Sequence, residues 1–231
     1  MNEQKTSAVS PEMVEGPYYS TGGEYRSNLR KGLPGQKLDL TITVVNAENG
    51  EPIAGVDVDF WQCDATGHYS GYDGDPDDLP TDITNGQVAT NDETFLRGRI
   101  TTNAQGRVTF QTIYPGWYRL RTSHVHLKIL EGEYCNITTQ LYFPEDVNQE
   151  LYKTPEYARN AEQDTFNNTD PVIANTSGEI ESLWVDVEKG PDLFLGSATL
   201  QIVPGNVNEL IIVPPGRIPP IGGRSHDKPV R

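Results

Sequence analysis

The chain has few cationic side chains and no long apolar run. Its 231 residues contain 18 Lys and Arg against 33 Asp and Glu, a net charge of −15 at pH 7. This charge opposes binding to phosphate backbones and anionic membranes, so we expect no nucleic-acid partner. No apolar run approaches the roughly 20 residues of a membrane-spanning helix, and residues 1–10 are polar where a secretory signal is hydrophobic. We expect no membrane contact, and both secretion and a cytoplasmic location stay open.

Cysteine is equally scarce, and no internal repeat is present. Cys63 and Cys135 are the two cysteines, and they pair only if the fold brings their α-carbons within about 7 Å. Two free thiols are an equal alternative. The length and the 35% hydrophobic content favour one domain over residues 1–231. Its expected parts are an N-terminal arm (1–36), a β-sandwich core (37–213) and a tail (214–231).

Alternation of apolar and polar residues predicts β-strands through most of the chain. At 37–45, Leu38, Leu40 and Ile42 alternate with polar neighbours, the pattern of a half-buried strand. Strands separated by Gly- and Pro-rich turns, with little helix, predict an all-β fold: an antiparallel β-sandwich with long loops and short peripheral helices. The other predicted strands are 56–61, 96–101, 107–113, a strand containing 124–129, 137–143, 194–203 and 209–213.

Three stretches depart from this pattern. Residues 70–94 are rich in Asp, Gly, Pro, Thr and Asn, and predict a long loop of the kind that lies over or beside a site. Residues 144–160 predict two short helical pieces, the first opened by Pro144 and an acidic first turn. The polar stretch that follows, up to Phe194, predicts irregular structure.

The most informative stretch is 112–126, which joins tyrosine and arginine to two histidines. Because side chains alternate along a strand, His124 and His126 point to one face while Val125 points into the core. Two imidazoles on one face indicate half of a metal site. The alternative is a transthyretin-like or prealbumin-like binding module, which shares the Pro-Gly-x-Tyr corner at 115–118, with the histidines incidental or holding some other metal. Such modules do not need the histidine pair, which favours the metal site.

Ligand chemistry narrows the choice of metal. Imidazoles alone suit zinc, copper, nickel or iron. A phenol has an ordinary pKa near 10, so tyrosine binds as phenolate only to a strongly charged, hard cation, and Fe(III) fits. Two tyrosinates and a hydroxide balance its three charges, which leaves a neutral site that a buried cavity tolerates. Tyr118 is one candidate ligand, and Tyr69, just past the 56–61 strand, is the candidate for the second.

These residues stand in the order and spacing of a known family. The chain resembles the intradiol ring-cleavage dioxygenases from about residue 11 to 144, and more weakly to 203. It looks most like the small, often secreted members, because the helical N-terminal region of catechol 1,2-dioxygenases and the carboxylate-binding contacts of protocatechuate dioxygenases are not found in the sequence. The matching positions are 15–19, 61–70, 95–98, 112–126 and 139–144.

The resemblance implies a metal centre. One Fe(III) per chain is expected, with Tyr69 and His124 as equatorial ligands. Tyr118 and His126 are the implied axial ligands, and Tyr118 is the ligand that the substrate displaces. The implied reaction is O2-dependent cleavage of a catecholic small molecule, between its two hydroxyl-bearing carbons, to a cis,cis-muconate-type diacid.

The resemblance also implies a substrate pocket. Arg121, permanently charged, is expected to stabilise negative charge that develops on the substrate. Gln140, Tyr18 and Asp64 are expected to contact the substrate. Neither the ring substituents of the substrate nor the oligomeric state follows from the sequence.

Overall fold

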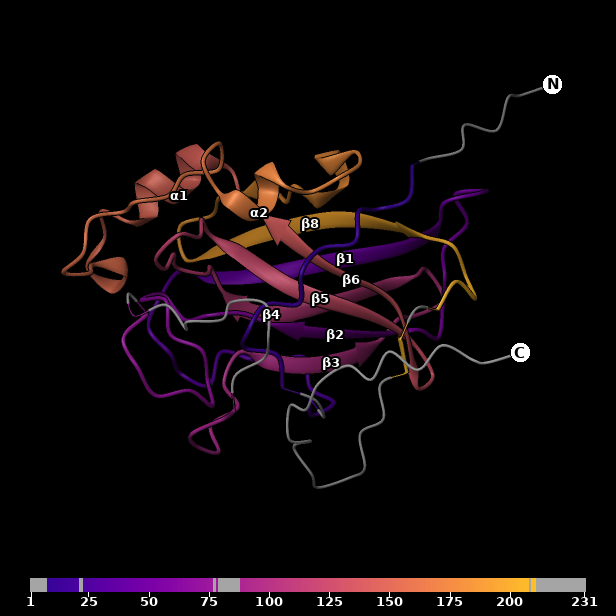
Figure 1. Cartoon of the computed structure of the whole chain (residues 1–231), viewed down its shortest axis with the longest axis horizontal. Coiled ribbons are helices and arrows are strands. Elements are labelled where there is room, and N and C mark those ends of the chain that lie inside the picture. Colours follow the sequence, from indigo (N-terminus) through magenta and orange to yellow (C-terminus); the bar gives the residue numbers. More distant parts are fainter. Residues whose placement is uncertain (1–7, 21–22, 77, 79–87, 208, 211–231) are drawn as a thin grey trace, which may run out of the picture.

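The computed structural model describes residues 8–20, 23–76, 78, 88–207 and 209–210, which form a β-sandwich (Figure 1). One sheet has the strand order β4-β1-β8-β7 and the other β3-β2-β5-β6-β9. The all-β prediction is therefore confirmed. The strands are β1 (Lys37–Asn46), β2 (Asp57–Trp61), β3 (Arg97–Thr101), β4 (Arg107–Ile113), β5 (His124–Glu131), β6 (Tyr134–Tyr142), β7 (Asp186–Glu188), β8 (Leu193–Ile202) and β9 (Glu209–Leu210).

The sandwich is antiparallel except for one central pair. β1 pairs with β8 in parallel, with Lys37 opposite Leu193 and Asn46 opposite Ile202. A parallel pair needs a long crossover connection, and the chain between the two strands supplies one. The expectation of a wholly antiparallel sandwich is corrected on this point, because strand alternation alone carries no information about direction.

The core lies between the sheets and is formed by the alternating positions that the sequence indicates. On β1, Leu38, Leu40 and Ile42 are fully buried, and on β5 so are Val125 and Leu127. The polar residues between them on β1 lie on the outer face. On β5 the opposite face is buried as well, and this second buried face carries the histidines.

The helical pieces lie together at one edge of the sandwich (Figure 1). The two pieces predicted within 144–160 are present as α1 (Glu145–Leu151) and the 3-10 turn η1 (Pro155–Tyr157). The stretch predicted to be irregular contains α2 (Pro171–Ala174), η2 (Ile180–Leu183) and β7. Asp170 caps α2 through its side chain, followed by Pro171 at the first helical position. This local signal was present in the sequence and was overlooked.

The structure also reports on the cysteines, the long loop and the C-terminal strand. Cys63 and Cys135 are both buried, and they do not form a disulfide with each other. The described parts of 70–94 contain no helix or strand, as predicted for a loop. The strand predicted at 209–213 is present at Glu209–Leu210, and its remainder and the tail at 214–231 lie outside the described residues. Among the described helices, none has the length and apolar character needed to span a bilayer.

Candidate metal centre

The histidines of β5 lie next to each other on its polar face. His124 and His126 are at most 1% exposed, and their Nε2 atoms are 3.0 Å apart. Nδ1 of His124 lies 2.7 Å from the carbonyl oxygen of Thr122. A carbonyl only accepts, so Nδ1 carries the proton and the lone pair of Nε2 is directed at the space between the rings.

Burial sets the charge state of both rings. Desolvation lowers the pKa of His124 well below its usual value, and the positive charge of Arg121 adds to this effect. Desolvation and then His124 and Arg121 lower the pKa of His126 in the same way. Both imidazoles are therefore neutral at physiological pH, which is the form that ligates metals.

Two phenols complete the cluster. The hydroxyl of Tyr69 lies 3.1 Å from Nε2 of His126 and 3.4 Å from Nε2 of His124. The hydroxyl of Tyr118 lies 3.3 Å from Nε2 of His124. Tyr69 and Tyr118 are each 4% exposed. The four predicted ligands thus converge on one point, although they come from three separate segments of the chain.

Two glycines allow the tyrosine-bearing turns to approach this closely. Gly67 has φ +95°, and a Cβ there would lie 2.6 Å from the carbonyl oxygen of Trp117. A Cβ at Gly116 would lie 2.4 Å from the carbonyl oxygen of Ala65. Each turn therefore needs a glycine where it presses on the other, and a side chain at either position would separate the two phenols.

The spacing of the donors fits one ion. Ligand atoms about 2.0 Å from a shared ion lie about 2.8 to 3.3 Å apart for angles between 90° and tetrahedral. The measured separations run from 3.0 to 3.4 Å. Burial raises the pKa of Tyr69 and of Tyr118 above the ordinary phenol value, so without a cation both stay protonated. Only a strongly charged cation offsets that burial, and this donor set therefore suits Fe(III).

The His126 ring is held by packing. Its plane stacks on Trp61 at an interplanar angle of 9°, with ring centres 4.9 Å apart. A Cβ at Gly16 would lie 3.1 Å from Cε1 of His126. No described residue bonds its Nδ1, so the Trp61 stack and the Gly16 backbone fix the orientation of the ring. Trp61 is itself buried, so it joins the site to the packed interior.

Arg121 is held beside the cluster by three partners. Its Nη2 donates to Oε1 of Gln140 at 2.5 Å and to the hydroxyl of Tyr142 at 3.2 Å. Its Nε donates to Oδ2 of Asp170 at 2.9 Å. Gln140 in turn donates to the carbonyl oxygen of Val14 at 2.8 Å. The predicted residues Arg121 and Gln140 are therefore in direct contact, and the guanidinium has a fixed place beside Tyr118.

Asp170 is the contact that the sequence did not indicate. Its carboxylate is fully buried, accepts from Arg121 and from the backbone of Thr122, and caps α2 through Val172 and Ile173. The cap signal of Asp and Pro at 170–171 was readable in the sequence. Nothing local to that signal predicts a pairing with an arginine 49 residues earlier in the chain.

Tyr18 covers the cluster from the N-terminal segment. Its ring stacks on Tyr69, with centres 4.6 Å apart, and meets Tyr72 edge to face at 5.1 Å. Two hollows share Tyr18 as a wall. One, of about 70 Å³, is lined by Tyr118 and Arg121, and the other, of about 160 Å³, is lined by Tyr69 and Tyr72. Tyr18 thus separates the two hollows that reach the cluster.

Asp64 lies in the turn before Tyr69 and does not line either hollow. Its Oδ1 accepts from the backbone of Thr66 and His68 and from the Thr66 hydroxyl. Its carbonyl oxygen accepts from Gly116. One oxygen of the carboxylate thus holds the turn that carries Tyr69, and the residues lining the two hollows do not include Asp64.

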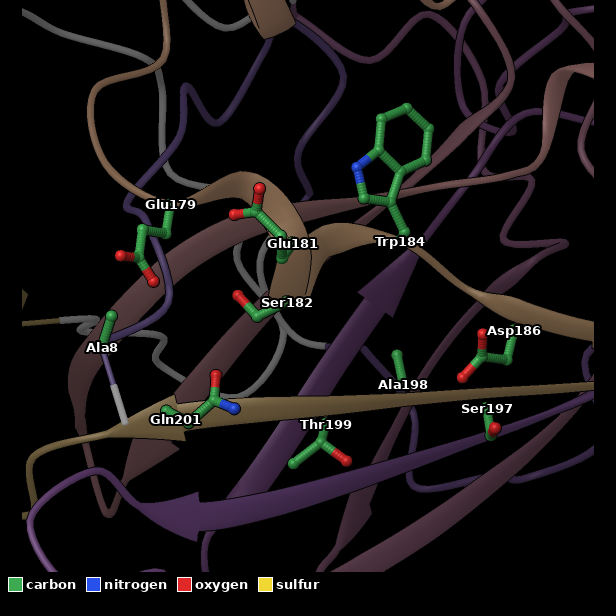
Figure 2. A pocket seen from close by; sticks show the side chains of 10 residues that line it. All are labelled: Ala8, Glu179, Glu181, Ser182, Trp184, Asp186, Ser197, Ala198, Thr199 and Gln201. Atoms are coloured by element: carbon green, nitrogen blue, oxygen red, sulfur yellow. The ribbon is translucent and has the colours of Figure 1, made fainter. Parts of the chain in front are cut away.

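A larger hollow lies elsewhere, beside β8, and is shown in Figure 2. This acidic groove has a volume of about 800 Å³ and is lined by Glu179, Glu181 and Asp186, with hydroxyl and amide side chains from η2 and β8. None of the four converging donors lines it. In the described part of the chain, no three His, Cys, Asp or Glu side chains gather as a metal site. The mixed histidine and tyrosine set is thus the one candidate centre among these residues.

Comparisons with known proteins point to the same chemistry. The family profile Dioxygenase_C, described as Dioxygenase, matches residues 14–175. A chlorocatechol 1,2-dioxygenase of Pseudomonas sp. (strain P51) is 26% identical over 163 residues, which cover 62% of this chain and 59% of that protein. The protocatechuate 3,4-dioxygenase beta chain of Burkholderia cepacia is 32% identical over 149 residues, 58% of each. The chain therefore spans about three fifths of the length of these curated relatives.

A solved structure gives a longer match. The intradiol ring-cleavage dioxygenase from Tetranychus urticae superposes with a TM-score of 0.76 and 29% identity, over 86% of this chain and 96% of that one. The match extends beyond the segment recognised by the family profile.

Proposed function

The chain belongs to the intradiol ring-cleavage dioxygenases, and from this premise we propose that it cleaves a catecholic substrate with O2 at one Fe(III). The observation that carries the proposal is the convergence of two neutral imidazoles and two phenols with separations of 3.0 to 3.4 Å. A transthyretin-like binding module has no use for four buried donors around one point. The proposed ligands are Tyr69, Tyr118, His124 and His126.

The net reaction balances without a reductant. One carbon–carbon bond breaks, between the two hydroxyl-bearing carbons of the ring. Both atoms of O2 enter the product, a cis,cis-muconate-type diacid. Fe(III), when bound, supplies the Lewis acidity that activates the catechol towards O2.

The protein's own groups divide the remaining work. Tyr118 faces the smaller hollow, and as a tyrosinate in the iron-loaded protein its oxygen would take a proton from an incoming catechol hydroxyl. Arg121 lines the same hollow, and its permanent charge stabilises negative charge on the ring. Gln140 and Asp170 position the guanidinium. Tyr18, stacked on Tyr69, shields the bound catechol ring from water. Asp64 holds the turn of Tyr69 through its Oδ1.

The test is to load the purified protein with iron and follow metal, colour and oxygen together. We expect one iron per chain, a burgundy colour from tyrosinate-to-Fe(III) charge transfer, and one O2 consumed per catechol. With ¹⁸O2, both labelled atoms should appear in the diacid by mass spectrometry. Tyr118→Phe should shift the colour while one tyrosinate remains. A colourless protein without oxygen uptake, or a product cleaved outside the two hydroxyl-bearing carbons, would overturn the proposal.

A further inference from the structure

Exposed apolar side chains gather at the mouth of the smaller hollow. Val14 is 50% exposed and Leu120 is 43% exposed, and both line the hollow that reaches Tyr118 and Arg121. Single exposed apolar residues are ordinary on protein surfaces. Here residues from three separate segments share one cavity edge. We call this set the apolar rim: Val14, Pro17, Leu120, Pro171 and Val172.

Leu120 keeps its place at a conformational cost. Its φ is +64°, a left-handed conformation that disfavours residues with a Cβ. Its backbone N–H donates to Oδ1 of Asp164 at 3.1 Å, which holds the turn in this state. Such strain occurs where a function fixes the direction of a side chain. In this case the strained turn directs an apolar side chain to the rim, between Tyr118 and Arg121.

The size and position of the hollow define its occupant. A volume of about 70 Å³ is several times the roughly 10–15 Å³ that holds one water, so it admits a small group but not a peptide segment. Tyr118 and Arg121 line this hollow. A group bound there therefore lies next to the reacting ring and is expected to be a substituent of the same molecule. Most of the lining is apolar, and the guanidinium of Arg121 is already engaged by Asp170 and Gln140, so the hollow favours an uncharged group.

We propose that the apolar rim is a subsite for a small alkyl substituent on the catechol ring, and that Leu120 sets the preference for alkylated rings. This inference rests on the proposed function. Arg119 also lines the hollow and is exposed, so a carboxylated ring is the competing occupant. The two occupants differ in charge, which makes them separable by experiment.

The test compares specificity constants for catechol, 3- and 4-methylcatechol, 4-ethylcatechol and 3,4-dihydroxybenzoate. One methyl or methylene group seated in an apolar pocket changes kcat/KM by about 10-fold or more. We expect the better methyl isomer to exceed catechol by about that factor, and the carboxylated ring to be the poorest substrate. Leu120→Ala and Val14→Ala should each reduce the ratio of alkylated to unsubstituted catechol several-fold.

The controls separate side chain, backbone and general effects. Leu195→Ala removes another exposed leucine, 47% exposed on the outer face of β8, and should leave the ratio unchanged. Leu120→Gly relieves the left-handed backbone while it also removes the side chain, so it should lower the ratio as Leu120→Ala does. Calorimetric titration with phenol, 4-ethylphenol and 4-hydroxybenzoate, which are not catechols, measures the same preference without turnover.

The two proposals fail in different ways. If catechol is consumed but the ratio is unchanged in both Leu120 variants, or the carboxylated ring is preferred, the subsite is wrong and the enzyme assignment stands. If no catechol is consumed, the proposed function fails. The phenol titrations then still decide whether the rim binds alkyl groups, and equal affinities for phenol and 4-ethylphenol would reject it.

Discussion

The buried donor cluster and the acidic groove beside β8 are opposite kinds of hollow. The groove is large and open, with exposed carboxylates at Glu179, Glu181 and Asp186. The cavity at the cluster is roughly a tenth of its volume, yet neutral imidazoles and phenols converge beside it. Charges in an exposed groove are solvated by water, whereas the donors at the cluster are buried and face one another. In this protein, groups able to hold a metal therefore occur where buried side chains converge, and not where the hollow is largest.

The largest expected effect comes from removing one converging donor. His126→Ala deletes an imidazole whose Nε2 lies 3.0 Å from that of His124. We expect iron retention and kcat to fall by more than the 10- to 100-fold that loss of an outer-shell partner typically causes. Metal analysis, the charge-transfer band and oxygen uptake should fall together. The exposed His68 supplies the matched control, since His68→Ala should retain the iron. An iron-replete, coloured His126→Ala protein would contradict the ligand assignment.

A smaller effect on kcat is expected from Asp170, which contacts Arg121 and not the four converging donors. Asp170→Asn keeps the size of the side chain but removes the charge that faces Arg121. Breaking a buried ion pair on one side costs about 3–5 kcal/mol of unfolding free energy. Because Arg121 is then less well positioned, we also expect kcat to fall by about 10-fold or more with little change in KM.

The groove provides the control for Asp170. Asp186→Asn makes the same chemical change at an exposed site, and denaturant titration should find its stability within about 0.5 kcal/mol of the parent. Asp170→Glu restores the charge and should recover part of kcat. Equal losses in the Asp170→Asn and Asp186→Asn proteins would remove the distinction between the two regions.

The smallest effect is expected when the acidic groove is neutralised. Replacing Glu179 and Glu181 with Gln, together with Asp186→Asn, removes three like charges from a chain of net charge −15. We expect unchanged oxygen uptake and a gain in stability of about 0–1 kcal/mol that shrinks with added salt. A clear loss of catechol turnover in the triple variant would give the groove a part in the reaction.

The sequence predicts most of the sandwich and the members of the cluster. Strand alternation identified the core face of β1 and the shared face of His124 and His126, because both depend only on neighbours two residues apart. Tyr69 was accessible only through its motif, since its approach to His126 depends on how two turns pack. The ligand roles themselves stay predictions.

Two features were not predicted: the ion pair that positions Arg121, and the parallel direction of β8 relative to β1. The pairing of Asp170 with Arg121 joins residues on separate elements, and no local pattern encodes such a contact. The bonds from Oδ1 of Asp64 to its own turn were also not predicted, and its contact with the substrate stays a prediction. The parallel pairing of β1 and β8 was missed for the same reason, because periodicity reports which face a residue occupies but not which strand lies beside it.

That parallel pairing has a consequence for the biosynthesis of the protein. β1 lies between β4 and β8, but Leu193, the first partner on β8, leaves the ribosome long after Lys37. Until then β1, with its alternating apolar side chains, presents an open edge to other nascent chains. A message truncated before codon 193 therefore yields a polypeptide that contains every proposed iron ligand yet has an unsealed sheet, and such a fragment is a substrate for chaperones rather than a smaller enzyme.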